Sequence, residues 1–187
     1  SYQTNGNGSI TGIIVQEGLL FDVMEAGTFN EPADLAFVPP LVPIAASDPE
    51  GTPAGWLFVT DAADNSIGVV TLATVGGAVG DDATRVIGQL TATFTYSFLS
   101  NPVGIAYSAG SDTLYIANRG NGTITAIRPD GTGETSYDTG FGANALNGID
   151  VVFGGTEDVL YLTNTAGNDD PSADGFSTLE RLVITLP

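Results

Sequence analysis

Short apolar runs, separated by polar and glycine-rich turns, recur in one order along the chain. In three places an apolar run is followed by an apolar-aromatic run that ends on Asp or Asn, and then by a third apolar run. The first runs cover residues 32–37, 102–107 and 148–153, the second 57–61, 114–118 and 160–164, and the third 67–70, 124–127 and 179–184. Runs of this length bounded by Gly, Pro, Asn and Asp are typical of β-strands. We therefore predict an all-β fold built from repeats.

The spacing of the repeats predicts the architecture. Leu114 and Leu160 stand at the same place in the second and third repeats, 46 residues apart. The first repeat is longer because it contains insertions at residues 39–55 and 73–84. Repeats of about 40 to 50 residues with four short strands are typical of β-propeller blades. We predict a β-propeller-like array of about three four-stranded blades plus a partial blade, which a neighbouring chain could complete.

The repeat pattern also places both ends of the chain inside a blade. Residues 7–13 nearly repeat residues 121–127, so we expect the chain to open on the loop and third strand of a blade that lacks its first two strands. The run at 182–186 belongs to a third strand with no fourth strand after it. We expect a fourth strand at residues 91–99, where apolar and hydroxyl side chains alternate.

These boundaries predict a single domain over residues 1–187. Its parts are a partial blade at 1–29 and three blades at 30–100, 101–145 and 146–187.

The second repeat carries a recognisable motif. It reads Asn-Pro-Val-Gly-Ile-Ala-Tyr at 101–107 and Leu-Tyr-Ile-Ala-Asn-Arg-Gly-Asn-Gly-Thr-Ile at 114–124, and it has the turn Pro-Asp-Gly at 129–131. This pattern resembles NHL-type repeats and the wider group of lactonase-like propellers. The first repeat departs from it at Asp34, where the family usually has Gly, and the third departs at the long loop 165–177. The resemblance implies a propeller fold, usually closed by about six blades, and this chain holds barely half of that number.

Composition and charge exclude several functions. Among 187 residues there are 22 acidic side chains against four basic ones, all arginine, for a net charge of −18, and there is no Lys, His or Cys. The chain therefore has no Cys/His zinc site, no thiol nucleophile and no Ser-His-Asp triad. Four cations are too few to neutralise a row of phosphates, which excludes nucleic acid as a partner. Residues 86–111 are uncharged but polar throughout, so we expect no membrane insertion.

Oxygen-bearing side chains gather in the long loop of the third repeat. Asn164, Asn168, Asp169, Asp170 and Asp174 offer the hard oxygen ligands that Ca²⁺ prefers, and calcium is the cofactor that this cluster predicts. The same residue types also form ordinary turns, so a plain loop is the alternative.

A smaller cluster of the same kind follows the second strand of the first repeat. It consists of Asp61, Asp64 and Asn65.

The lactonase-like resemblance implies a second type of metal site, at the propeller axis. Its ligands would be Asp34 and Asp150, which the sequence places at matching inner positions, together with Asn118 or Asn164. The family's full ligand set does not carry over, so we assign no catalytic residue, and enzymatic activity stays open.

Two glycosylation sequons occupy equivalent places in the repeat. They are Asn7-Gly-Ser and Asn121-Gly-Thr. Asn-Gly is also the commonest tight-turn pair, which is the alternative explanation.

Two function classes follow. The first is an extracellular or cell-surface structural protein whose partners are copies of itself, joined head to tail by β-strand complementation into a filament or surface layer. It rests on the unpaired strand edges expected at both ends of the array and on an acidic, soluble surface. The alternative is a metal-dependent lactonase-like hydrolase or a ligand-binding propeller module.

Overall fold

The chain folds into antiparallel β-sheets joined by turns. The computed structural model describes residues 2–5, 8–14, 19–40, 53–75, 85–165 and 178–186. Within them the chain forms strands β1 to β14 and no helix. Two of the sheets have four strands and two have three.

The first and second sheets come from the N-terminal half of the chain. The first sheet contains β1 (Tyr2–Thr4), β2 (Ile10–Ile14) and β3 (Leu19–Met24). The second contains β4 (Pro32–Val38), β5 (Pro53–Asp61), β6 (Ser66–Val75) and β7 (Arg85–Phe94).

The third and fourth sheets come from the C-terminal half. The third sheet contains β8 (Pro102–Ser108), β9 (Thr113–Asn118), β10 (Thr123–Ile127) and β11 (Thr135–Asp138). The fourth contains β12 (Leu146–Phe153), β13 (Glu157–Asn164) and β14 (Thr178–Thr185). In every sheet the strands follow one another in chain order.

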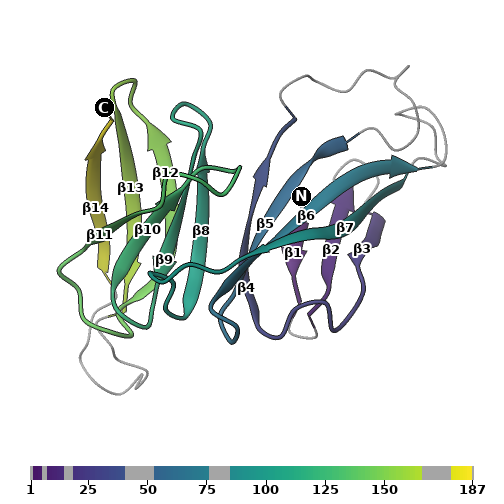
Figure 1. The fold of residues 1–187 in the computed structure, drawn as a ribbon, viewed down its shortest axis with the longest axis horizontal. Helices are drawn as coiled ribbons and strands as arrows, with labels where there is room; N and C mark the ends of the chain where they lie inside the picture. Colours follow the sequence, from purple (N-terminus) through teal and green to yellow (C-terminus); the bar gives the residue numbers. More distant parts are fainter. Residues whose placement is uncertain are drawn as a thin grey trace.

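The four sheets are arranged side by side in chain order (Figure 1). The first sheet contacts the second, and the fourth contacts the third, so the first and fourth sheets are the two ends of the array. Each of the three junctions contains its own cluster of buried hydrophobic side chains. This arrangement confirms the prediction of an all-β, β-propeller-like fold.

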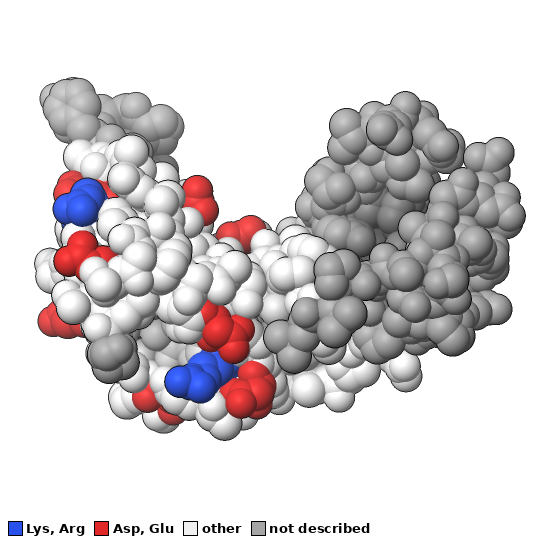
Figure 2. Space-filling view, turned by 90° about the horizontal axis from the view of Figure 1, so that it is seen from above, with Lys and Arg blue, Asp and Glu red and all other residues white. Residues whose placement is uncertain are grey.

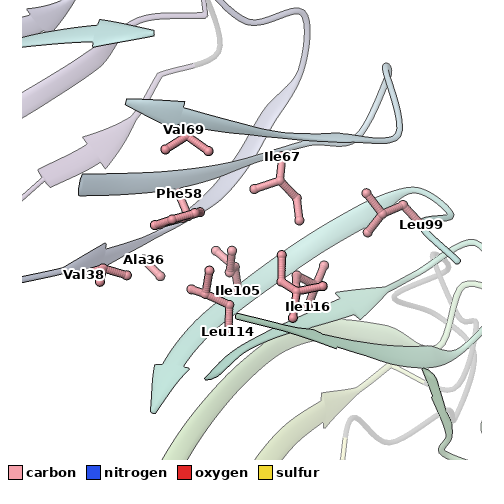
Figure 3. Close-up of a cluster of buried hydrophobic side chains, with 10 residues drawn as sticks. Ala36, Val38, Phe58, Ile67, Val69, Leu99, Ile105, Leu114 and Ile116 are labelled. Carbon is pink, nitrogen blue, oxygen red and sulfur yellow. The ribbon is translucent and has the colours of Figure 1, made fainter. Parts of the chain in front are cut away.

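The junction between the second and third sheets illustrates how the sheets pack. Phe58, Ile67 and Val69 of the second sheet face Ile105 and the neighbouring aliphatic residues of the third (Figure 3). Phe58 is 1% exposed and Ile67 is fully buried. Burial of a side chain of this size contributes about 1.5 to 3 kcal/mol. In the second and third sheets, apolar residues on the two faces therefore belong to two different junctions.

Two strands differ from the sequence prediction. The segment Tyr2–Thr4 pairs with β2, so the first sheet has part of a second strand before its third. The sequence missed it because three residues without an apolar run carry no periodic signal. The fourth strand of the second sheet runs from Arg85 to Phe94 rather than over 91–99. Apolar and hydroxyl side chains go on alternating in the sequence beyond Phe94, but the backbone turns at Ser97 and Phe98 and then enters β8.

Strand register corrects the alignment of the third repeat. Leu35 pairs with Val59, Ile105 with Ile116, and Ile149 with Leu162, in each case two residues before the Asp or Asn that ends the second strand.

Asp34 therefore corresponds to Gly104 and Gly148, and the prediction that Asp34 and Asp150 occupy matching positions is wrong by two residues. Side chains in a strand alternate with a period of two, so a two-residue shift leaves the apolar pattern unchanged and invisible in the sequence.

Candidate functional site

In the second and third sheets, the Asp or Asn that ends the second strand binds the segment that enters its own sheet. The Asp61 carboxylate accepts hydrogen bonds from the backbone N–H groups of Asn30 (2.7 Å) and Glu31 (3.0 Å), just before β4. Asn118 accepts from the N–H of Ser100, just before β8, at 3.1 Å. Its amide donates to the Thr125 hydroxyl at 2.9 Å. These side chains stabilise the sheet, and this role accounts for the recurring Asp/Asn.

The small predicted cation cluster has the same structural role. Asp64 accepts a hydrogen bond from the Asn30 amide at 2.8 Å, and Asn65 accepts from the backbone N–H of Asn101 at 2.6 Å. Asp61, Asp64 and Asn65 therefore connect the turn after β5 to the segments that precede β4 and β8.

Asp34 connects two sheets. One carboxylate oxygen accepts the N–H of Leu35 at 2.8 Å, and the other accepts the N–H of Ile105 in β8 at 3.0 Å. Burial raises the pKa of Asp34, while the hydrogen bonds from Ile105 and Leu35 lower it. Because both oxygens bind backbone N–H groups, Asp34 acts in sheet packing, and its position gives no support to the implied axial metal site.

A buried carboxylate lies between the third and fourth sheets. Asp158 is fully buried, and its oxygens accept hydrogen bonds from the hydroxyls of Ser108 (2.7 Å), Ser111 (2.5 Å) and Tyr115 (2.7 Å). Burial and the hydrogen bond to Asp158 raise the pKa of the Tyr115 phenol. Three neutral hydroxyl donors stabilise this carboxylate, which is fully buried between the two sheets.

The hydrogen-bonded cluster around Asp158 was not predicted from the sequence. In the sequence Asp158 stands just before the apolar run 159–162, where turn residues are common, and only the structure shows that it lies in β13 and is buried.

The predicted calcium site lies mainly outside the described residues. Asn164 ends β13 and is half-buried, whereas Asn168, Asp169, Asp170 and Asp174 fall in the part of the chain that the structure does not describe. Among the described residues no group of three or more His, Cys, Asp or Glu side chains could hold a metal ion. Calcium at this loop stays a prediction.

Of the two sequons, Asn121 is described and Asn7 is not. Asn121 is exposed in the turn between β9 and β10, and its side-chain oxygen accepts from the backbone N–H (3.2 Å) and the hydroxyl (2.8 Å) of Thr123. The next residue, Gly122, has φ of 74°, and a Cβ there would lie 2.2 Å from the Phe141 carbonyl oxygen. The turn thus requires glycine, which explains the Asn-Gly pair without a glycan. Modification at Asn121 stays a prediction.

A cavity of about 360 Å³ lies beside the third sheet, lined by residues that include Tyr115, Arg128, Tyr137 and Leu186. It opens to solvent. Its lining is mostly hydroxyl and aliphatic, with a single cation, and it brings together no catalytic set.

The fourth sheet differs from the second and third at its edge. In those sheets the third strand, β6 or β10, pairs with a fourth strand, β7 or β11. The corresponding strand β14 has eight residues and, within the described residues, pairs only with β13. Its outer N–H and C=O groups form an open edge to which another strand can add.

The fourth sheet also exposes large apolar side chains. Val152 is 53% exposed, Tyr161 37% and Leu179 70%. They come from β12, β13 and β14 respectively. Leu160 and Leu162, on either side of Tyr161, are buried against the third sheet, and Val151, next to Val152, packs against the same cluster. Because side chains alternate across a strand, the three exposed residues lie on the opposite face, away from the third sheet.

Charged side chains are scattered on the face of the molecule that Figure 2 shows. Acidic side chains lie apart from one another there, and arginines lie close to some of them. On this face the described residues form no basic patch that could bind an anionic polymer. None of the described residues forms a helix long and apolar enough to cross a membrane.

Comparison with known proteins supports the fold. No known family model matches the sequence, and no curated protein matches it. A chain in a solved structure, "Crystal structure of Nidogen/Laminin Complex", is similar at a TM-score of 0.53 and 15% identity over 88% of this chain. A chain of Kuenenia stuttgartiensis hydrazine synthase is similar at a TM-score of 0.40 and 14% identity, covering 98% of this chain and 62% of that one.

The nidogen/laminin match is to a β-propeller, and it shows the fold alone. This chain covers 52% of the length of the chain it matches there, so it spans about half of that structure.

Proposed function

We propose that this is an extracellular structural protein that assembles from copies of itself into a filament or surface layer through β-strand complementation. In this assembly, a strand of one copy adds to the fourth sheet of another. The contact is heterologous, because the edge of the fourth sheet meets a different part of the next copy. Contacts of this kind build rings or open filaments.

The open edge of β14 is the observation that carries the proposal. Its equivalents β6 and β10 each pair with a fourth strand, whereas no described strand pairs with the outer edge of β14. Long unpaired edges invite pairing with another chain, and strand addition is a common way of making a specific contact. The eight residues of β14 offer a longer edge than the four of β11.

Localisation outside the cell is part of the same proposal. A net charge of −18 without Lys, His or Cys favours a highly soluble acidic surface, as is common in secreted proteins.

We also assign the repeats to the NHL type. Two features of the structure support this: the close approach of Gly104 to Ile149 of the next sheet and the role of Asn118 in holding the entry to β8. No feature of the described residues favours the hydrolase.

The experiment is amide hydrogen exchange at increasing protein concentration, combined with light scattering and electron microscopy. We expect particles larger than one chain, with slower exchange in the peptide that contains β14. The peptide with β11, also an outer strand of its sheet, is the internal control and should keep its exchange rate. Discrete monomers at high concentration, with β14 exchanging as fast as before, would show the proposal to be wrong.

A further inference from the structure

The face of the fourth sheet that points away from the third has counterparts in the two sheets before it. Strand register makes Val152 equivalent to Val38 and Ser108, Tyr161 to Phe58 and Tyr115, and Leu179 to Ile67 and Ile124. By the same register Asp150 is equivalent to Ala36 and Ala106, and Arg181 to Val69 and Ala126. We call Asp150, Val152, Tyr161, Leu179 and Arg181 the open face.

In the second and third sheets every one of these positions is buried by the sheet that follows. Phe58 and Tyr115 are each 1% exposed, and Ile67 and Ile124 are fully buried. At the same positions of the fourth sheet, Tyr161 is 37% exposed and Leu179 70%. The open face thus keeps apolar residues where the array uses them to bind the next sheet, but within the described residues no sheet covers them. Contiguous exposed apolar side chains commonly mark interaction sites.

The tyrosine at this position makes a specific contact at the preceding junction. The Tyr115 hydroxyl donates a hydrogen bond to the Asp158 carboxylate of the next sheet, at a distance of 2.7 Å. Tyr161, its equivalent, places a hydroxyl at the same point of the open face. A sheet that covers the open face in the same way would bring an acceptor to the Tyr161 hydroxyl, as Asp158 is brought to Tyr115.

Charge distinguishes the open face from its counterparts. Asp150 and Arg181 lie in register on either side of Tyr161, where the third sheet has alanines on either side of Tyr115. Arg181 is one of only four basic residues in a chain with 22 acidic ones. An exposed arginine on a binding face favours an acidic partner. Copies of this chain, each with a net charge of −18, meet that requirement.

We infer that the open face binds a β-sheet of a second copy of this chain, face to face, in continuation of the junctions within the array. The first sheet lies at the opposite end of the array, and among the described residues the second sheet is the sheet that packs against it, so it is the sheet of the second copy that continues the order. This inference rests on the proposed self-association but names a different surface. Strand complementation uses the edge of β14, whereas this contact uses the face that β12, β13 and β14 share.

The chain contains no Cys, so the reactivity of a single introduced cysteine reports one position. A cysteine on the open face therefore tests that face separately from the edge of β14. Val152 lies on β12, which β13 separates from the edge strand β14. Val152→Cys should react with a maleimide in dilute protein and become protected, by about tenfold or more in rate, in assembled protein. Phe98→Cys is the matched control: Phe98 is 44% exposed in the segment between β7 and β8, and its reactivity should not change.

A charge reversal gives an independent readout. Arg181→Glu should raise the concentration needed for assembly about tenfold, which corresponds to about 1.4 kcal/mol. Arg128→Glu makes the same change in net charge at an exposed turn between β10 and β11, so it should shift assembly much less.

The outcomes separate this inference from the proposed filament. Filaments or layers in which the thiol of the Val152→Cys variant is protected support both, and discrete closed particles in which that thiol is protected support the inference but contradict the filament. Assembled protein in which the same thiol stays as reactive as in dilute solution overturns the inference and leaves strand complementation standing. Equal effects of Arg181→Glu and Arg128→Glu also overturn it. Protein that remains monomeric at all concentrations overturns both.

Discussion

At the scale of single residues, polar side chains in this protein mainly connect backbone segments and sheets. Asp158 is the most demanding case, because a fully buried carboxylate is costly unless it is well hydrogen-bonded. Its three hydroxyl donors come from the third sheet and the turn after β8. No described side-chain nitrogen or oxygen is buried without a hydrogen-bond partner. The cluster therefore fixes how the third and fourth sheets meet.

Tyr115→Phe tests this role. The change removes one donor to Asp158 and leaves the ring in place, so we expect the free energy of unfolding to fall by about 1.5 kcal/mol. Urea unfolding followed by tryptophan fluorescence measures it. Tyr137→Phe is the control, because the hydroxyl of the half-buried Tyr137 makes no hydrogen bond among the described residues. A loss no larger than that of the control would mean that Asp158 does not need this donor.

The raised pKa values of Tyr107 and Tyr115 predict that the protein loses stability at alkaline pH. Burial and the hydrogen bond to Asp112 raise the pKa of Tyr107 to about 12, and the pKa of Tyr115 is raised for similar reasons. An unfolded tyrosine loses its proton near pH 10. Above that pH the unfolded chain has released protons that the folded chain retains, so stability falls as pH rises.

We expect a smaller loss between about pH 9 and about pH 11 in the double variant Tyr107→Phe/Tyr115→Phe than in the unchanged protein. Urea midpoints at the two pH values measure it. Equal losses in the two proteins would assign the alkaline limit to other groups.

At the scale of strands and sheets, the hydrogen bond from Ile105 to Asp34 ties the first strand of one sheet to the first strand of the next. The third sheet has glycine at the equivalent position, Gly104, and a Cβ there would lie 3.1 Å from the side chain of Ile149. At this position the junction between the second and third sheets is held by a carboxylate, whereas at the junction between the third and fourth sheets a glycine lets the two sheets approach closely.

Asp34→Ala should lower the free energy of unfolding by about 2 kcal/mol, because the N–H of Ile105 loses its acceptor. Asp150→Ala provides the comparison: Asp150 is exposed and accepts only from the N–H of its neighbour Val151 among the described residues, so a change within about 0.5 kcal/mol is expected in dilute protein. Thermal unfolding of both variants measures the two changes in stability. Similar losses of stability would show that the hydrogen bond from Ile105 to Asp34 contributes little.

Strand identity could be predicted from the sequence because alternation and turn residues are local properties. Register between repeats could not, as the misplaced Asp150 shows, because only hydrogen-bond pairing fixes a two-residue shift. The unpaired edge of β14 was expected from the repeat order. The open face was not, since Tyr161 and Leu179 have the same alternation as buried residues, and exposure depends on what lies beside the sheet.

At the scale of the whole molecule, a net charge of −18 on each copy opposes association, and Arg181 offsets only part of this repulsion at the open face. Salt weakens this repulsion because the Debye length falls from about 30 Å at 0.01 M to about 3 Å at 1 M. Apolar contacts such as those of Leu179 are not weakened in the same way.

We expect assembly to increase with sodium chloride over this range, measured by light scattering. Calcium chloride and magnesium chloride at matched ionic strength separate screening from a specific site. A response to calcium well above that to magnesium would support the cation site predicted around Asn164 and Asp169. Assembly that weakens steadily as salt rises would contradict the view that repulsion is the main obstacle.

The arrangement of sheets in a row links folding to association. An end sheet has one neighbour and an inner sheet has two, so the fourth sheet gains fewer stabilising contacts than the third and should open before it. A copy bound at the open face would turn this end sheet into an inner one. Binding to the folded state alone raises apparent stability by mass action. The unfolding temperature of this protein would then rise with its concentration, and the fourth sheet would become more rigid when a second copy binds.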